Sequence, residues 1–299
     1  MPDQKLPAIT IAMPVYNCAA TVAAAILSIQ NQIFTDWELI IIDDGSTDDT
    51  WSVANKFSDP RITLIKQDRN LGLPTRLNEA VQLSRGEYFA RMDGDDISYP
   101  ERFALQYEYI CKHPEVDLLG CAILIFDAEG QAKGVRQGRL THEQIRGGFA
   151  SSFSMAHVTW IGRRDWFVRN PYRASAFHSQ DRELLMRTYP HSRFAALPDV
   201  LVGVREPGVH LKKLLPARCQ YGRFLLLESI SQRSPFLLGA VGAEIGKAGL
   251  DLVAVASGLN YSLLRHRIPT LPASERERWD AVRKTINVSN ATVMTAFAG

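Results

Sequence analysis

The fold of this chain is decided by one stretch, Tyr88-Phe89-Ala90-Arg91-Met92-Asp93-Gly94-Asp95-Asp96. Its three carboxylates come just after an apolar run, so a strand that ends in an acidic loop would present oxygen atoms at the edge of a sheet. Gly94 permits a tight bend that points Asp93 and Asp95 toward one ligand. Mg²⁺ or Mn²⁺ suits such oxygens, and Mg²⁺ is usually held by one or two carboxylates together with a substrate's phosphates. Taken alone, the same sequence also fits a solvated acidic turn, because Asp and Gly are common turn residues.

The chain upstream of this stretch alternates between strand and helix patterns. Short apolar runs at residues 9–13, 37–42 and 62–65 predict buried strands. Apolar residues recur at helical spacing over residues 19–32, and a further helix is expected to end near residue 84. Such alternation predicts right-handed crossovers and an α/β fold with a largely parallel sheet.

Polar clusters follow three of the expected strands, namely Pro14-Val15-Tyr16-Asn17, Asp43-Asp44 and Asp93-Gly94-Asp95. In parallel sheets, ligands bind at the carboxyl ends of the strands. The three clusters therefore predict one binding site on a single rim of the sheet.

The sequence lacks the two common phosphate-binding glycine motifs. Neither Gly-x-Gly-x-x-Gly nor a loop ending in Gly-Lys-Ser/Thr follows the first strand. We therefore expect phosphates to be held through a metal on the acidic loop. Asp44 can accept hydrogen bonds from a base or from ribose hydroxyls, or it can serve in a turn or helix cap. Ser46 or Thr47 is the expected cap of the following helix.

Four runs together resemble the family 2 glycosyltransferases with the GT-A fold: residues 14–17, residues 37–48, Asn70-Leu71-Gly72-Leu73 and residues 86–96. The resemblance is tight over residues 8–126 and looser to about residue 205. It implies a Rossmann-like, mainly parallel sheet, a nucleotide-diphosphate sugar as donor, and Mn²⁺ or Mg²⁺. UDP is the first candidate nucleotide, with GDP and dTDP left open.

The resemblance also assigns roles to individual residues. Tyr16 and Asp44 would hold the base, Asp93 the ribose, and Asp95 the metal that bridges the diphosphate, with Asp93 also near that metal. Arg76 would lie near the nucleotide, or it is an ordinary surface arginine. The remaining donor-site candidates are Pro14, Val15, Asn17, Asn70, Gly72 and Met92.

The second half carries the expected acceptor site. A helix is predicted over residues 100–112, a strand over 116–126, and a short helix opened by a capping box at Thr141-His142-Glu143-Gln144. His157 falls in a run, residues 155–160, that reads as a strand. It is either a satisfied core residue or, as in the family, a residue near the donor's diphosphate or the acceptor.

Asp181 is the expected general base. It lies in the first turn of a predicted amphipathic helix, where the helix dipole favours the ionised form that a base needs. The segment resembles the family's acidic pair, in which the second acid is the base; Gln180 replaces the first acid here. The alternative is an N-cap aspartate.

The region after the last predicted strand, residues 200–205, departs from the family. Many members have Tyr-Arg-x-His there, with the histidine reaching the metal, so His210 would serve only through a shifted loop. The Gln-x-x-Arg-Trp motif of polymerising members is absent. We therefore expect the addition of one sugar or a few.

Composition fits a globular protein with a distinct tail. Of 299 residues, 46% are hydrophobic and 22% charged, and the net charge of +2 argues against a dedicated nucleic-acid binder. We divide the chain into a GT-A catalytic domain (1–210) and a helical extension (211–299). The donor half would cover about residues 1–97 and the acceptor half about 98–210.

The tail is basic and helical. From Arg205 onward, 13 Lys and Arg face 7 Asp and Glu, a net charge of +6. Ser234-Pro235 opens a helix on which Glu244, Lys247 and Asp251 form a narrow polar stripe, and three such charges argue against a membrane span. The helices would pack on the catalytic domain, join a second copy of the chain, or lie on an anionic membrane surface.

The four cysteines are scattered without metal-ligand spacing and, with no signal peptide, indicate reduced thiols in a cytoplasmic protein. Contact with the inner face of the membrane would come through the tail. The resulting hypothesis is an inverting, metal-dependent transferase that moves a sugar onto a glycan or lipid-linked acceptor in cell-surface polysaccharide synthesis. The alternatives are a sugar nucleotidyltransferase, which should carry a basic Gly-rich loop where residues 14–17 stand, and a non-catalytic nucleotide-sugar-binding protein. The presence of Asp93, Asp95 and Asp181 together argues against the latter.

Overall fold

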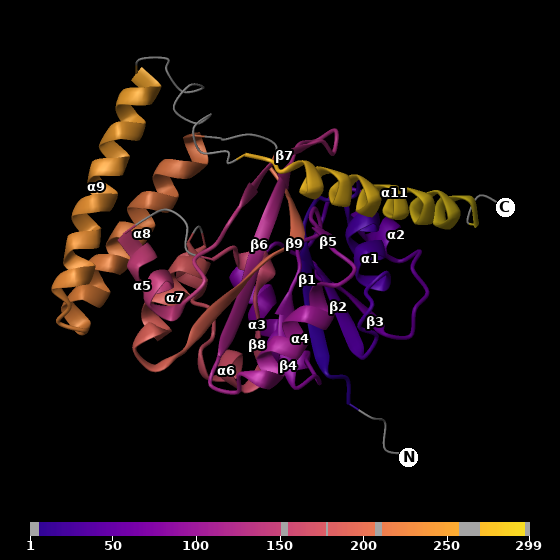
Figure 1. Cartoon of the computed structure of the whole chain (residues 1–299), viewed down its shortest axis with the longest axis horizontal. Helices are drawn as coiled ribbons and strands as arrows, with labels where there is room; N and C mark the ends of the chain where they lie inside the picture. Colours follow the sequence, from indigo (N-terminus) through magenta and orange to yellow (C-terminus); the bar gives the residue numbers. More distant parts are fainter. Residues whose placement is uncertain (1–5, 151–154, 178, 207–210, 257–269, 297–299) are drawn as a thin grey trace.

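The computed structural model describes residues 6–150, 155–177, 179–206, 211–256 and 270–296. A central nine-stranded sheet has the order β3-β2-β1-β4-β8-β6-β9-β5, with β7 paired to β6. Helices cover the sheet, and the described helices of the C-terminal tail pack around it (Figure 1). The predicted α/β architecture with a helical C-terminal extension is confirmed.

The first half is parallel, as predicted. Strands β1 (Ile9–Val15), β2 (Trp37–Asp43), β3 (Ile62–Lys66) and β4 (Tyr88–Arg91) alternate with helices α1 (Val22–Gln30), α2 (Thr50–Ala54) and α3 (Leu73–Leu83). Because β1 lies between β2 and β4, the loops that follow these three strands meet at one rim of the sheet.

The second half is mixed. Its strands are β5 (Ile97–Ser98), β6 (Leu118–Phe126), β7 (Ala132–Arg136), β8 (Ile161–Arg163) and β9 (Phe194–Arg205). β8 runs antiparallel to β4 and β6, whereas β6 and β9 are parallel. The helices and 3₁₀ turns of this half are α4 (Arg102–Lys112), α5 (His142–Gly147), η1 (Gly148–Ala150), η2 (His157–Thr159), α6 (Arg164–Arg169), η3 (Ala174–Ala176), α7 (Gln180–Thr188) and η4 (Tyr189–His191).

Local hydrogen bonds explain three outcomes at element ends. The capping box of α5 is confirmed, because Gln144 N donates to Thr141 Oγ1 and Gln144 Oε1 accepts from Thr141 N. The strand predicted around His157 is wrong, because Thr159 Oγ1 donates to Ala156 O and stabilises the 3₁₀ turn η2. The cap predicted at Ser46 or Thr47 is also wrong.

Helix α2 instead begins after Asp49. Ser46 and Thr47 form hydrogen bonds with the loop after β1. Ser46 Oγ accepts from Asn17 N, and Thr47 N donates to Asn17 Oδ1. These bonds join the loop after β2 to the loop after β1.

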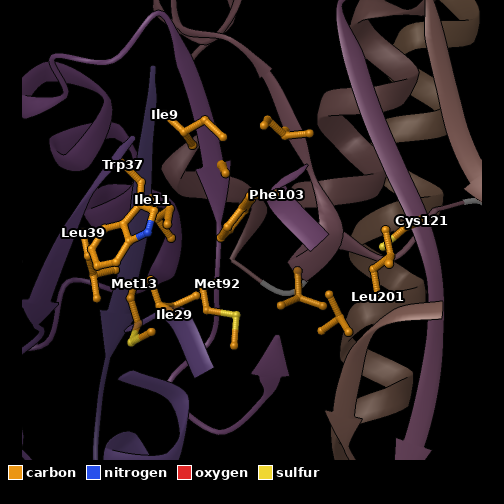
Figure 2. Close-up of a cluster of buried hydrophobic side chains, with 14 of the residues drawn as sticks. Ile9, Ile11, Met13, Ile29, Trp37, Leu39, Met92, Phe103, Cys121 and Leu201 are labelled. Atoms are coloured by element: carbon orange, nitrogen blue, oxygen red, sulfur yellow. The ribbon is translucent and has the colours of Figure 1, made fainter. Parts of the chain in front are cut away.

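The centre of the sheet is buried on both faces. β1 and β2 are buried along their whole length, as expected for strands between two layers of helices. On one face Ile11, Trp37 and Leu39 pack with Ile29 of α1 and Phe103 of α4 (Figure 2). The other face packs against α3, α6 and α7.

The C-terminal helices α8 (Leu211–Ser231), α9 (Pro235–Ala256) and α11 (Ala273–Ala296) join these cores. Tyr221 and Leu237 belong to the core under α7, and Trp279 belongs to a core with Phe126 of β6. Packing of the tail on the rest of the chain, one of the predicted alternatives, is therefore observed. Among the described helices, none has both the length and the apolar character that a membrane crossing requires. The side chain of Asp251 lies outside the described residues.

Candidate active site

Two cavities open at the rim where β1, β2 and β4 end. The larger cavity, about 520 Å³, is lined by residues 14–21, by Asp48 and Leu73, by the acidic loop and by Arg205. The smaller cavity, about 240 Å³, is lined by Asp96, Arg136, residues 155–158, Asp181, Arg182 and Glu206, among others. Arg91 and Asp93 line both cavities and form the wall between them.

The loop after β1 shapes the larger cavity. Asn17 has a positive φ of 51°, which Asn tolerates better than most residues, and its side chain ties this loop to Thr47. Pro14 and Val15 are buried at the end of β1, whereas Tyr16 is 48% exposed on the cavity. The structure thus places Tyr16 where a planar base could lie against it.

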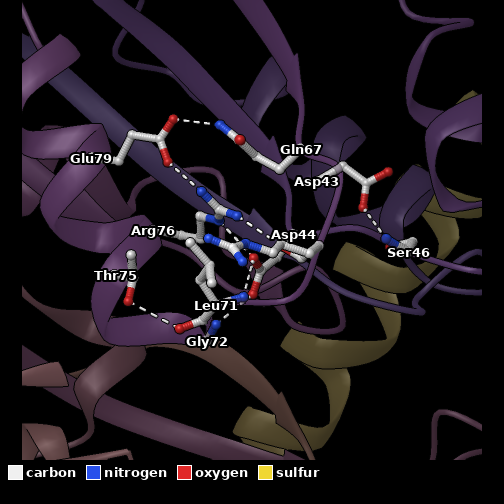
Figure 3. A network of polar contacts seen from close by, with 10 residues as sticks. Asp43, Asp44, Ser46, Gln67, Leu71, Gly72, Thr75, Arg76 and Glu79 are labelled. Carbon is white, nitrogen blue, oxygen red and sulfur yellow. Dashed lines mark hydrogen bonds and ion pairs between the residues drawn. The ribbon is translucent and has the colours of Figure 1, made fainter. Parts of the chain in front are cut away.

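Asp44 is the centre of a buried polar network (Figure 3). Its Oδ1 accepts from Leu71 N (2.9 Å) and Arg76 Nε (2.6 Å), and its Oδ2 accepts from Gly72 N (2.8 Å). Burial alone would lower the pKa of Arg76, but Glu79 and Asp44 raise it. With only 5% of its side chain exposed, Arg76 is not an ordinary surface arginine.

This network fixes the loop before α3, which carries the predicted residues Asn70 and Gly72. Gly72 has a φ of 84°, and a Cβ there would lie 2.2 Å from the ring of Phe177, so the position requires glycine. Within the described part of the chain, Asp44, Asn70, Gly72 and Arg76 stand behind the larger cavity rather than lining it.

The acidic loop is packed tightly against the loop after β1. A Cβ on Gly94 would lie 2.7 Å from Val15 Cγ1 and 2.9 Å from Cys18 Sγ, and Thr21 Oγ1 donates to Gly94 O (2.8 Å). The side chain of Met92 lies in the buried core (Figure 2), and it lines neither cavity. Asp93, Asp95 and Asp96 bring one oxygen each to within 4.8 Å of one another.

The electrostatics of this loop favour a cation. Partial desolvation by the surrounding loops and the Asp93 carboxylate raise the pKa of Asp95 to about 6, and burial with both neighbouring carboxylates raises the pKa of Asp96 well above its usual range. Asp93 Oδ1 already accepts from Arg91 Nη2 (2.6 Å) and Asp96 Oδ1 from Arg205 N (2.9 Å), while Asp95 is exposed. An all-oxygen set with excess negative charge fits Mg²⁺ or Mn²⁺.

The smaller cavity brings Asp181 to the same wall. Asp181 lies in the first turn of α7, as predicted. His157 Nε2 lies 2.9 Å from the Tyr172 hydroxyl, and burial together with Arg91 lowers its pKa well below the usual range, so the imidazole is neutral. With its amide nitrogen facing them, Gln180 donates to the carbonyl oxygens of Phe177 and Ala176, and so it supports the turn before α7.

Comparison with known proteins identifies the family. The model of "Glycosyl transferase family 2" matches residues 10–169, which is more than half of the chain. The chain belongs to family 2 of the glycosyltransferases. A relative in Bacillus subtilis (strain 168), "Putative glycosyltransferase EpsE", is 38% identical over 133 residues, 44% of this chain and 48% of that protein. The chain therefore matches about half the length of that relative.

A second relative and two solved structures extend the comparison. The Escherichia coli "UDP-Glc:alpha-D-GlcNAc-diphosphoundecaprenol beta-1,3-glucosyltransferase WfgD" is 29% identical over 63% of this chain and 72% of that protein. S. aureus TarS 1-349 has a TM-score of 0.58 at 18% identity, over 73% of this chain and 65% of that chain. The mannosyltransferase PcManGT from Pyrobaculum calidifontis, in complex with GDP-Man and Mn²⁺, has a TM-score of 0.57 at 15% identity, over 96% and 88%. The two likenesses to solved structures confirm the predicted GT-A fold.

Three arginines of this family 2 chain lie at the cavities but were not predicted from the sequence as site residues. Arg91 has 5% of its side chain exposed, and no described residue accepts from its Nε. Arg182 lies between Glu244 of α9 (2.8 Å) and the ring of Tyr221, and Arg205 donates from its Nε to Asp95 O (3.2 Å). For Arg91 a signal was available, because an arginine between an apolar run and an acidic loop sits at the end of a buried strand. His210 lies outside the described residues.

Proposed function

We propose that this protein transfers a sugar, with inversion, from a nucleotide-diphosphate donor to a hydroxyl of a glycan or lipid-linked acceptor. The observation that carries this proposal is the pair of cavities that share the wall formed by Arg91 and Asp93. One cavity contains the acidic loop and the other contains Asp181, so a donor and an acceptor could meet at that wall.

In this proposal the donor, a UDP-sugar as first candidate, occupies the larger cavity. The base lies against Tyr16, and Asp93 accepts from the ribose. Asp44 stands behind this cavity and already accepts three hydrogen bonds, so its proposed part in holding the base is to fix the loop at Leu71 and Gly72. Mn²⁺ or Mg²⁺ held by Asp95 would supply positive charge that offsets the charge on the departing nucleoside diphosphate.

The acceptor occupies the smaller cavity, beside Asp181. Asp181 takes the proton of the acceptor hydroxyl while that oxygen forms a bond to the anomeric carbon of the sugar. The bond from that carbon to the phosphate oxygen breaks on the opposite side, so a single displacement inverts the configuration. Neutral His157 orients the acceptor, and the cation of Arg91 faces the diphosphate from the shared wall.

The described C-terminal hairpin supports a membrane-linked acceptor. Helices α8 and α9 expose the large apolar side chains of Leu226, Leu227, Ile230, Phe236, Leu238, Ile245 and Val253. Arg223 and Arg233 are exposed on the same hairpin. We propose that this apolar, basic surface lies on the inner face of an anionic membrane, with residues 1–210 as the catalytic domain above it.

Vesicle flotation tests the membrane contact. The full-length protein should float with anionic vesicles, and a variant with Leu227→Glu and Ile230→Glu should not. Equal flotation of both proteins would contradict the contact. A dimer in solution that the same variant dissociates would show that the surface binds a second copy instead.

The reaction is tested by incubating the purified protein with Mn²⁺ and a panel of nucleotide sugars, first by thermal shift and then by transfer. The expected products are a nucleoside diphosphate and an inverted glycoside. Pyrophosphate released from a nucleoside triphosphate and a sugar phosphate would indicate a nucleotidyltransferase. Donor binding without transfer or hydrolysis across a broad acceptor panel would indicate a non-catalytic protein.

A further inference from the structure

Arg205, at the end of β9, links the acidic loop to a distant turn. Its backbone N donates to Asp96 Oδ1 (2.9 Å), and its Nε donates to Asp95 O (3.2 Å). Its Nη1 donates to the carbonyl oxygens of Asp127 (3.4 Å) and Ala128 (3.1 Å) in the turn between β6 and β7. One side chain thus joins two loops that are more than 30 residues apart in sequence.

The C-terminal helix α11 holds the same turn from its other side. Trp279 Nε1 donates to Gly130 O (2.9 Å), and Arg283 Nη2 donates to Glu129 O (3.0 Å). The Trp279 ring is 1% exposed, and its centroid lies 4.7 Å from that of Phe126. A Cβ on Gly203 of β9 would lie 2.3 Å from this ring, so helix and strand are in direct contact.

We propose that α11 is a brace for the donor site, with Trp279 and Arg283 as positioning residues that act through Arg205. The proposal rests on the donor role of the acidic loop. Three carboxylates within 4.8 Å repel one another when no cation is bound, so the loop opens unless its backbone is held. The helix fixes the turn at residues 127–130, the turn fixes Arg205, and Arg205 fixes the backbone around Asp95 and Asp96. Donor affinity therefore depends on α11, although no described residue of that helix lines the larger cavity.

Point variants of the full-length protein isolate this path. Trp279→Phe removes the indole N–H but keeps a ring beside Phe126, and Arg283→Ala removes the second donor. Arg283→Lys keeps one hydrogen-bond donor at this position and should therefore behave much like the wild type. Lys284→Ala, at an exposed position of the same helix, is the matched control.

Two readouts are needed. Hydrogen exchange of the metal-free protein should speed up over residues 93–98 and 127–131 in the variant that combines Trp279→Phe with Arg283→Ala, while its circular dichroism is unchanged. The affinity for UDP with Mn²⁺, measured by calorimetry, should fall about tenfold, the scale of one or two lost hydrogen bonds. The control should match the wild type in both.

A double-mutant cycle with Arg205→Ala decides the path. If α11 acts through Arg205, adding Trp279→Phe to Arg205→Ala weakens UDP–Mn²⁺ binding no further. Additive losses, or unchanged exchange over residues 93–98, would overturn the brace. If the wild type binds no nucleoside diphosphate, the proposed function fails, and hydrogen exchange alone still decides whether α11 holds the loop.

Discussion

At the scale of single residues, the carboxylates of the acidic loop repel one another in the metal-free protein. The pKa of Asp95 is raised from an ordinary 3.8 to about 6 by partial desolvation in the loop and by Asp93. The folded protein then holds this proton more tightly than the unfolded chain does, so stability falls as the pH rises from 3.8 to about 6. The full penalty is present at neutral pH.

Replacement of this carboxylate should therefore stabilise the metal-free fold. Asp95→Asn is expected to raise the free energy of unfolding at pH 7.5 by about 1 kcal/mol, a figure kept small because solvent screens an exposed carboxylate. The gain should shrink as the pH is lowered toward 4, as thermal unfolding at several pH values would reveal. A variant less stable than the wild type at pH 7.5 would contradict this account.

Arg76 illustrates what the sequence could not show. The placement of Asp44 at the rim followed from its position after an apolar run, but no local spacing encodes its contact with an arginine 32 residues away. Met92 is a similar case, because the side of the chain that faces the core at the end of β4 depends on packing against α4. Local pattern located the site, and tertiary contacts decided which side chains enter it.

Loss of Arg76 should be costly. Arg76→Ala would leave the buried carboxylate of Asp44 and the half-buried carboxylate of Glu79 without their cation, at a cost of roughly 3 kcal/mol in the free energy of unfolding. Arg76→Lys should recover only part, because an ammonium cannot reproduce the guanidinium fork. Urea unfolding measures both, and a loss below 1 kcal/mol for Arg76→Ala would rule out the structural role.

At the scale of elements, the alternation of strands and helices in the first half was predictable because β1, β2 and β4 are short, mainly apolar runs that are buried along their whole length. The second half was harder. Residues 155–160 are apolar enough for a strand, yet the hydroxyl of Thr159 bonds to Ala156 O and makes a 3₁₀ turn. That choice matters, because the turn places His157 on the smaller cavity.

The contact between α7 and α9 offers a test at this scale. Glu244 is 2% exposed and accepts from Arg182 (2.8 Å) and Arg218 (3.2 Å). Burial alone would raise the pKa of Glu244, but Arg182 and its other cationic partners lower it. Arg182, next to Asp181, is thereby held at the smaller cavity.

Glu244→Gln should release Arg182 and affect the acceptor side alone. We expect the acceptor KM to rise roughly fivefold, the scale of one weakened charge-assisted hydrogen bond, with the donor KM unchanged. Glu277→Gln, at an exposed position of α11, is the control. An equal rise in both KM values would mean that the contact supports the fold in general and not the acceptor cavity.

At the scale of the whole molecule, the C-terminal helices support the site at two points. α9 reaches the smaller cavity through Glu244 and Arg182, and α11 reaches the larger cavity through the turn at residues 127–130 and Arg205. The sequence predicted a helical tail but not these contacts, because both join residues more than 60 positions apart. We therefore expect the tail to help hold the proposed active site in place.

The central claim is that one wall separates a donor cavity from an acceptor cavity, with the chemistry assigned to Asp181. The most direct measurement compares turnover with UDP–Mn²⁺ affinity in Asp181→Asn. The account predicts a fall in turnover of about 10²- to 10⁴-fold, the usual contribution of a general base, with the affinity unchanged. Asp95→Asn should show weakened metal-dependent binding instead. Near-normal turnover in Asp181→Asn would contradict the account.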